Sequence, residues 1–262
     1  MKDTAQPPAK LVFPLRKYRG FVAQARQLRK ELSARLIEAT GGIVQHGPLT
    51  GLRLPAERTW GNDAAVQLFG IYEQQLFPYL CGHKNAVLVD IGAADGFWAV
   101  GLVQAGHFDR AICFESRAQS RAAIAELARG NGVQDKIAVH GSADETAWDT
   151  IRRDTHDGET RVILIDIEGG EFDLLSPDFL RNAAGSTVIV ELHPWAAAGD
   201  EPVDALIAAS ARWFDATLID DAQRDVSGLL AHARLPDYLR YVLISEERAR
   251  QQQWLILTPR KV

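Results

Sequence analysis

The sequence contains few cysteines and no long apolar run. Cys81 and Cys113 are the only cysteines among 262 residues, and their spacing matches neither a metal site nor a secreted disulfide framework. We expect Cys113 to be a buried strand residue. Because no apolar stretch has the length of a signal peptide or a membrane span, the sequence predicts a cytoplasmic protein without a membrane partner.

Basic residues are also fewer than acidic ones. The 29 lysines and arginines are outnumbered by 34 acidic residues, so the net charge is −5, whereas nucleic-acid binders are usually basic overall or in a clear patch. We therefore expect no nucleic acid partner. The apolar fraction of 47% is ordinary for a chain that builds a large α/β domain, with or without an appendage.

Short apolar strands alternate with helical segments from residue 86 onward. This alternation predicts an α/β fold with a doubly wound, mostly parallel seven-stranded sheet, formed by residues 61–262. The strands are expected at 86–91, 110–115, 136–140, 161–166, 186–192, 214–219 and 253–258. The helices are expected at 96–105, 117–130, 145–154, 171–181, 201–212 and 236–250.

Residues 1–60 are expected to form an extension: a loose arm over 1–15, a helix over 17–39 and a β-hairpin around His46. The helix is predicted from an apolar stripe of Phe21, Ala25, Leu28, Leu32 and Leu36. Its other face is basic, and we interpret that face as solvated. It consists of Arg16, Lys17, Arg19, Arg26, Arg29 and Lys30. Such an extension could serve a homodimer.

The segment VLVDIGAADGFW, residues 87–98, predicts a buried strand, a tight glycine turn and a helix start. Its spacing, D-x-G-x-x-x-G from Asp90, differs from the G-x-G-x-x-G of dinucleotide sites. It is typical of nucleoside-binding methyltransferases, in which the turn faces the amino-acid end of S-adenosylmethionine. We therefore predict a cofactor site at Asp90, Gly92, Ala93 and Gly96.

Polar residues after the next two strands extend this predicted cofactor site. Glu115 ends the second strand, where an acid accepts hydrogen bonds from ribose hydroxyls, with Ser116 beside it. Such an acid serves NAD and S-adenosylmethionine equally well. Ala143 and Asp144 follow the third strand and are placed near the adenine, although Asp144 suits a helix N-cap equally well.

A further helix is expected over residues 62–77, ended by Pro78. It carries Tyr72 on an apolar stripe. A helix at this place would cover the mouth of the cofactor site, so Tyr72 and Glu73 are candidate cofactor contacts. The alternative is an ordinary core tyrosine.

Acidic pairs follow the fourth and fifth strands. Asp166 and Glu168 are two residues apart, as are Glu191 and His193, so each pair points to one side of an extended chain. Carboxylates gathered in one crevice are costly unless they bind cations or hydrogen-bond donors, or hold protons. These strand ends therefore predict a functional site. Magnesium would be chemically possible there, but we predict no metal.

The segments DIGAADGFW, FES, IDIEGGEFDLL and VELHP, in this order, resemble the FkbM family of S-adenosylmethionine-dependent methyltransferases, over about residues 85–195. The resemblance implies a class I, Rossmann-like fold with S-adenosyl-L-methionine as cofactor. Residues 166–171 match the family's D-x-E-G-x-E segment, and Glu191 and His193 match its acid–x–His pair.

The predicted activity is O-methylation of a hydroxyl on a small molecule or sugar. His193 would be the base, oriented by Glu191, because an imidazole titrates near neutral pH. Asp166 would face the cofactor's methionine part or the acceptor, and Glu168 would help to bind the substrate. His193 could instead be structural. Residues 1–60 and 221–235 are the expected sources of the acceptor pocket.

Two other function classes stay open. One is an NAD(P)-dependent oxidoreductase, which the glycine spacing and the lack of a Tyr-x-x-x-Lys pair disfavour. The other is a non-catalytic nucleoside-binding module on the same fold. The glycines, Glu115 and the acids after the fourth strand, occurring together, argue against it.

Overall fold

The computed structural model describes residues 19–55, 64–156, 158–197, 201–220, 235–246, 248 and 252–260. The arm expected at 1–15 and nearly all of the loop expected at 221–235 lie outside these ranges. Among the described residues, no helix has the length and apolarity needed to cross a membrane.

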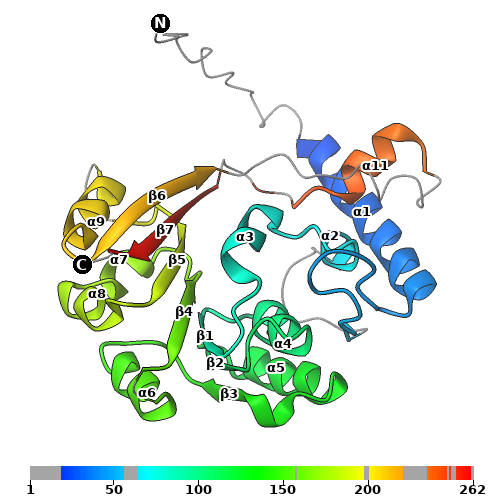
Figure 1. The fold of residues 1–262 in the computed structure, drawn as a ribbon. Helices are drawn as coiled ribbons and strands as arrows, with labels where there is room; N and C mark the ends of the chain where they lie inside the picture. Colours follow the sequence, from blue (N-terminus) through cyan, green and yellow to red (C-terminus); the bar gives the residue numbers. More distant parts are fainter. Residues whose placement is uncertain are drawn as a thin grey trace, which may run out of the picture.

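A seven-stranded sheet forms the centre of the molecule, with strand order β3-β2-β1-β4-β5-β7-β6. The first five strands are mutually parallel, and β7 runs antiparallel to both β5 and β6. The predicted fold class is thus confirmed (Figure 1). The strands are β1 (Ala86–Ile91), β2 (Arg110–Phe114), β3 (Ile137–His140), β4 (Thr160–Ile165), β5 (Thr187–Leu192), β6 (Phe214–Asp220) and β7 (Gln253–Pro259).

Helices cover both faces of the sheet because the strands are apolar on both sides. In β1, Leu88 packs into the core under α4 (Phe97–Gln104) and α5 (Ala118–Gly130), while Val87 and Val89 face the opposite core. That second core lies under α6 (Ala147–Asp154), α7 (Glu171–Leu174), α8 (Pro177–Ala183) and α9 (Pro202–Ser210) (Figure 1). Such double coverage explains why the strands read as continuous apolar runs.

The expected hairpin is reduced to one antiparallel bridge between Ile43 and Arg53. Its loop carries Leu49 and Leu52, which are almost fully buried in the same core as Leu102 of α4. The segment after the first helix is therefore packed against the face of the sheet that α4 covers.

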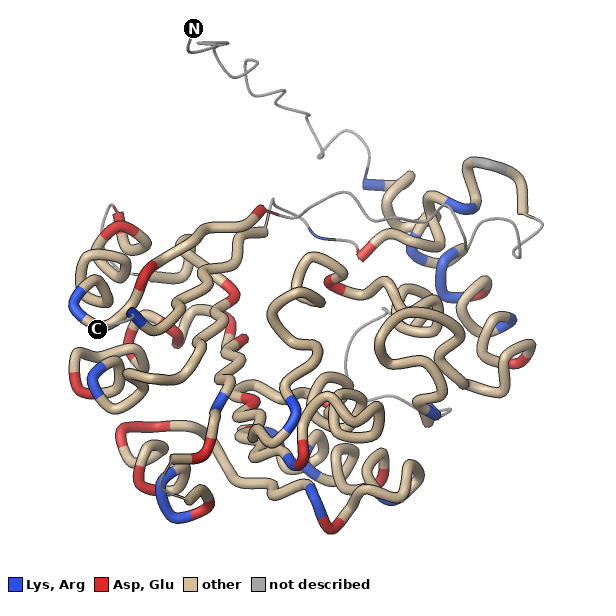
Figure 2. Tube along the Cα trace, in the orientation of Figure 1, with Lys and Arg blue, Asp and Glu red and all other residues tan. Residues whose placement is uncertain are grey.

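The first helix, α1 (Arg19–Thr40), is confirmed, but its predicted faces are partly wrong. Phe21 is 67% exposed, whereas Arg29 is buried and donates a hydrogen bond to the carbonyl of Ser245. The helix packs against α2 (Ala64–Leu68) and α11 (Asp237–Leu243), and that carbonyl after α11 gives the guanidinium a buried partner. Other basic residues recur along α1 (Figure 2).

The helix expected at 62–77 is wrong, because the chain turns sharply after α2. Gly70 has φ +69°, and a Cβ there would lie 1.8 Å from the carbonyl oxygen of His46. The chain then forms a 3-10 turn (Gln74–Leu76) and α3 (Phe77–Leu80). Pro78 lies in the first turn of α3, where its missing N–H costs nothing, so it begins a helix instead of ending one.

Two other expected helices are shorter than predicted. The helix expected at 171–181 divides into α7 and α8, because the Ser176 hydroxyl accepts from the Phe179 amide and caps α8. The helix expected at 236–250 is described as α11 and ends at Leu243. The chain beyond it returns toward the sheet with Glu246 and Arg248.

Gly92 allows the turn after β1 to lie against the end of β4. It has φ +90°, and a Cβ at this position would lie 1.8 Å from the carbonyl oxygen of Asp166. We expect Gly92→Ala to lower the free energy of unfolding by more than Gly132→Ala does, measured by urea denaturation.

Gly132 is the matched control, since it has φ +70° but open space around its Cβ. Gly132→Ala should therefore cost only the left-handed backbone energy of about 1–2 kcal/mol. Gly92→Ala adds a steric clash worth about 1–3 kcal/mol more. Equal losses in the two variants would show that the approach to Asp166 is not tight.

Candidate functional site

Three acidic side chains and a tryptophan lie on one face of the sheet, at the edge where the parallel strands end. Asp90, Asp166 and Glu191 continue the alternation of Leu88, Leu164 and Ile189, all of which belong to the core under α4 and α5. Trp254 of β7 lies directly opposite Glu191 in the β5–β7 pair. The strand register therefore brings together acids that are far apart in the sequence.

The glycine turn is tied to both neighbouring strands. The amides of Gly92 and Ala93 donate to the carbonyl of Phe114 at the end of β2, and the Asp166 amide donates to Ile91. The Ala94 amide donates to Glu115 Oε2 at 3.0 Å. Ala94 holds this position with φ +48°, a strained conformation of a kind that clusters at functional sites.

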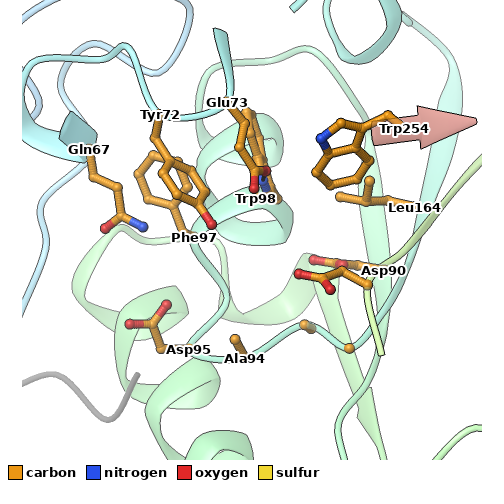
Figure 3. Close-up of a pocket in the computed structure, with 13 residues that line it drawn as sticks. Gln67, Tyr72, Glu73, Asp90, Ala94, Asp95, Phe97, Trp98, Leu164 and Trp254 are labelled. Carbon is orange, nitrogen blue, oxygen red and sulfur yellow. Dashed lines mark hydrogen bonds between the residues drawn. The ribbon is translucent and has the colours of Figure 1, made fainter. Parts of the chain in front are cut away.

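Two open pockets lie on either side of this turn and share Gly92, Ala94 and Asp166. The first, of about 530 Å³, is lined by acids and aromatic rings (Figure 3). They include Tyr72, Glu73, Asp90, Asp95, Phe97, Trp98 and Trp254. The second, of about 890 Å³, is lined by Glu115, Ser116, Arg117, Ser142, Ala143, Ile167 and Glu168, among others. Both volumes include space that is open to solvent.

Most residues predicted to bind a cofactor line these pockets. Asp90, Gly92, Ala93, Tyr72 and Asp166 line the first pocket, while Glu115, Ser116 and Ala143 line the second. Tyr72 is half-buried and packs edge-on against Phe97, with ring centroids 5.5 Å apart.

Gly96 and Asp144 line neither pocket. Gly96 is the N-cap of α4, so it shapes the turn from outside the linings. Asp144 is exposed and accepts from the amide and the hydroxyl of Thr146, the residue that caps α6. Asp144 thus stabilises the turn that begins α6, a role similar to the helix N-cap that was the alternative to an adenine contact.

A buried carboxylate, Glu171, holds His193. Its Oε1 accepts from the His193 amide at 2.6 Å and lies 3.2 Å from Nδ1, and its Oε2 accepts from the Gly169 amide. The prediction that Glu191 orients His193 is therefore wrong, because Glu191 is occupied by Arg248. Glu171 is the last residue of the D-x-E-G-x-E segment, so its place in that motif was the sequence feature that could have identified it as the partner of His193.

The other ring nitrogen of His193 faces the remaining acids. Nε2 lies 3.8 Å from Asp166 Oδ1 and 3.6 Å from Glu168 Oε2. Burial alone would lower the pKa of His193, but the hydrogen bond to Glu171 and nearby carboxylates raise it above 6.5. Burial likewise opposes ionisation of Glu171, yet the hydrogen bonds from His193 lower its pKa below 4.5.

Asp166, Glu191 and His193 also have ligand atoms within 4.8 Å of one another, a set that could hold a divalent cation. Burial and the charge of Asp166 raise the pKa of Glu191. The two neighbouring carboxyl groups therefore favour holding a proton over carrying two negative charges.

Arg248 joins three buried carboxylates and was not anticipated. Its guanidinium pairs with Glu73 Oε1 at 2.6 Å, with Glu246 Oε2 at 2.9 Å, and with Glu191. Burial, followed by the charge of Glu191, raises the pKa of Glu73 to about 8, although Arg248 opposes this. Burial also raises the pKa of Asp90 to about 7. Arg248 is one of several arginines in the C-terminal part, and nothing in the sequence distinguished it as a partner of these acids.

The chain matches no family model and no curated protein sequence. Among solved structures it is similar to the METTL16 MTase domain, with a TM-score of 0.54 and 12% identity over 89% of this chain and 80% of that chain. The fold is therefore of the Rossmann-like, class I methyltransferase type. At this identity the likeness concerns the fold alone.

Two bacterial structures are less similar. A protein in the NADB-Rossmann superfamily from Streptococcus agalactiae has a TM-score of 0.46 and 18% identity over 71% of this chain and 66% of that chain. The B. subtilis m1A22 tRNA methyltransferase TrmK has a TM-score of 0.42 and 15% identity over 70% of this chain and 63% of that chain. The chain spans about two thirds of their length.

We expect Glu171→Gln to lower the pKa of His193, because an amide no longer favours the charged imidazole while burial still opposes it. An NMR titration of the histidine ring protons measures this shift. Glu168→Gln is the matched control: Glu168 is also near Nε2, but its side chain is 70% exposed, so the shift should be smaller.

The Glu171–His193 pair should also make stability depend on pH. The raised pKa of His193 gives stability that is present below pH 6.5 and lost as pH rises through the folded-state value. The lowered pKa of Glu171 gives stability that is present above pH 4.5 and lost as pH falls. Glu171→Gln should therefore destabilise most between these values, and a pH-independent loss would contradict the pairing.

Proposed function

We propose that the protein binds S-adenosyl-L-methionine and transfers its methyl group. The observation that carries this proposal is the pair of pockets that share the Gly92–Ala94 backbone and Asp166, one lined also by Glu115 and the other by Asp90. Ligands of doubly wound sheets bind beyond the carboxyl ends of the strands, where these pockets lie. The class I methyltransferase fold is consistent with it.

The two pockets suit the two ends of this cofactor. In the larger pocket, Glu115 would accept from the ribose hydroxyls, with Ser116 and Ala143 beside the adenosine. In the smaller pocket, Asp90 and Asp166 offer negative charge to the ammonium and the sulfonium. The ring of Trp98 in the same pocket offers a π-face to a cation.

We further propose that the acceptor is a hydroxyl on a small molecule or sugar, with His193 as the base. Glu171 fixes Nδ1, so Nε2 is oriented to take the hydroxyl proton, as in other carboxylate–histidine pairs. The acceptor oxygen then forms a bond to the methyl carbon as the carbon–sulfur bond breaks, which leaves S-adenosylhomocysteine. Asp166 and Glu168 near Nε2 would position the acceptor, and no metal takes part.

Membership of the FkbM family is part of the same proposal. The segment Asp166 to Glu171 supports it, because its last acid binds the histidine that the resemblance aligned with the acid–x–His pair. Dimerisation through the N-terminal extension remains a prediction.

Calorimetry with S-adenosylhomocysteine and with NAD tests the cofactor. We expect the first to bind and the second not to bind. Glu115→Ala should weaken S-adenosylhomocysteine binding about 10- to 100-fold, the range for losing hydrogen bonds to a charged group. Glu126→Ala, at an exposed position on α5, is the matched control. Tighter binding of NAD would favour the oxidoreductase alternative.

Methyl transfer from tritiated S-adenosylmethionine to small-molecule alcohols, sugars and tRNA tests the acceptor. With an accepted hydroxyl, His193→Ala should lower kcat about 10²- to 10⁴-fold, the usual contribution of a general base. The affinity of the His193→Ala variant for S-adenosylhomocysteine should stay unchanged. Unaltered turnover would remove His193 from the chemistry, and methylation of tRNA alone would overturn the small-molecule acceptor.

A further inference from the structure

Among the residues that the structure describes, the buried indole N–H of Trp254 donates to no acceptor. The residue is 1% exposed, and within the described part of the chain its Nε1 has no hydrogen-bond partner. Buried tryptophans normally pair this N–H, because leaving it unpaired forfeits its hydrogen bond to water. An unmet donor at this position therefore points to a ligand.

Trp254 belongs to the lining of the smaller pocket. Trp254 lines it together with Asp90, Asp166 and Trp98, and its ring nitrogen lies on the side toward Trp98 and Glu73 (Figure 3). Glu73 is already occupied: its Oε2 accepts from Trp98 Nε1 at 3.0 Å and its Oε1 binds Arg248. The Glu73 carboxylate is thus held by other donors.

We infer that the Trp254 indole N–H binds the carboxylate at the methionine end of S-adenosylmethionine. The acids of this pocket complement the cofactor's ammonium and sulfonium, but they repel its carboxylate. An indole N–H donates and never accepts, so it suits a carboxylate and forms a charge-assisted bond with it. This assignment rests on the proposed cofactor, and it adds a residue of β7 to the site.

Trp254→Phe removes the N–H and keeps an aromatic ring in place. Two probes are compared by calorimetry: S-adenosylhomocysteine, and 5′-methylthioadenosine, which has the adenosine and the sulfur but no amino-acid carboxylate. We expect the variant to weaken S-adenosylhomocysteine about 10-fold or more and to leave methylthioadenosine unchanged. Trp148→Phe is the matched control, since Trp148 is a buried tryptophan of α6 on the opposite face of the sheet.

An unchanged affinity for S-adenosylhomocysteine overturns the inference. Equal weakening of both probes also overturns it, because that result reports pocket shape instead of a carboxylate contact. If the wild-type protein binds neither probe, the proposed cofactor itself is wrong and the inference fails with it.

A measurement on the wild-type protein covers the case in which Trp254→Phe does not fold. The ¹⁵N–¹H resonance of the Trp254 indole should shift on adding S-adenosylhomocysteine and shift much less with methylthioadenosine. Equal shifts with the two ligands would contradict the carboxylate contact.

Discussion

The close approach of Gly92 to the carbonyl of Asp166 is the contact on which the site depends. It brings the turn after β1 against the end of β4, and hydrogen bonds from this turn to Phe114 fix the end of β2 as well. Because the three strand ends are joined by backbone contacts, the two pockets share one wall of small residues. A side chain at residue 92 would separate β1 from β4 and so change both pockets at once.

Around this wall the protein gathers more negative charge than the interior readily holds. Glu73, Asp90 and Glu191 are all buried, and burial raises the pKa of each. Arg248 compensates part of this charge and connects Glu73, which precedes α3, to Glu191 at the end of β5. The remaining negative charge is what a cationic cofactor would complement, so the cost of burying these acids and the proposed ligand have one physical explanation.

The strands and most helices after residue 86 could be predicted, because a doubly covered parallel sheet leaves a regular apolar pattern in the chain. The helix expected at 62–77 could not, since Gly70 lies against His46, a contact between segments that sequence periodicity does not report. The same reason applies to Arg29, whose burial depends on a carbonyl after α11. At the site, Asp166, Glu191 and His193 were found from strand-end positions, whereas Glu171, Arg248 and Trp254 were not found from the sequence.

The succession of strands along the chain, the glycine turn and the set of acids at the strand ends follow from the sequence, because local spacing and apolar runs encode them. Which acid pairs with which partner depends on how the chain folds. Glu191 is only two residues from His193 in the sequence, yet Glu171 orients the histidine. Glu191 instead pairs with Arg248, which is 57 residues away. The packing of distant segments determines which buried charges pair, because a buried ion is stable only beside a counter-charge that the folded chain brings to it.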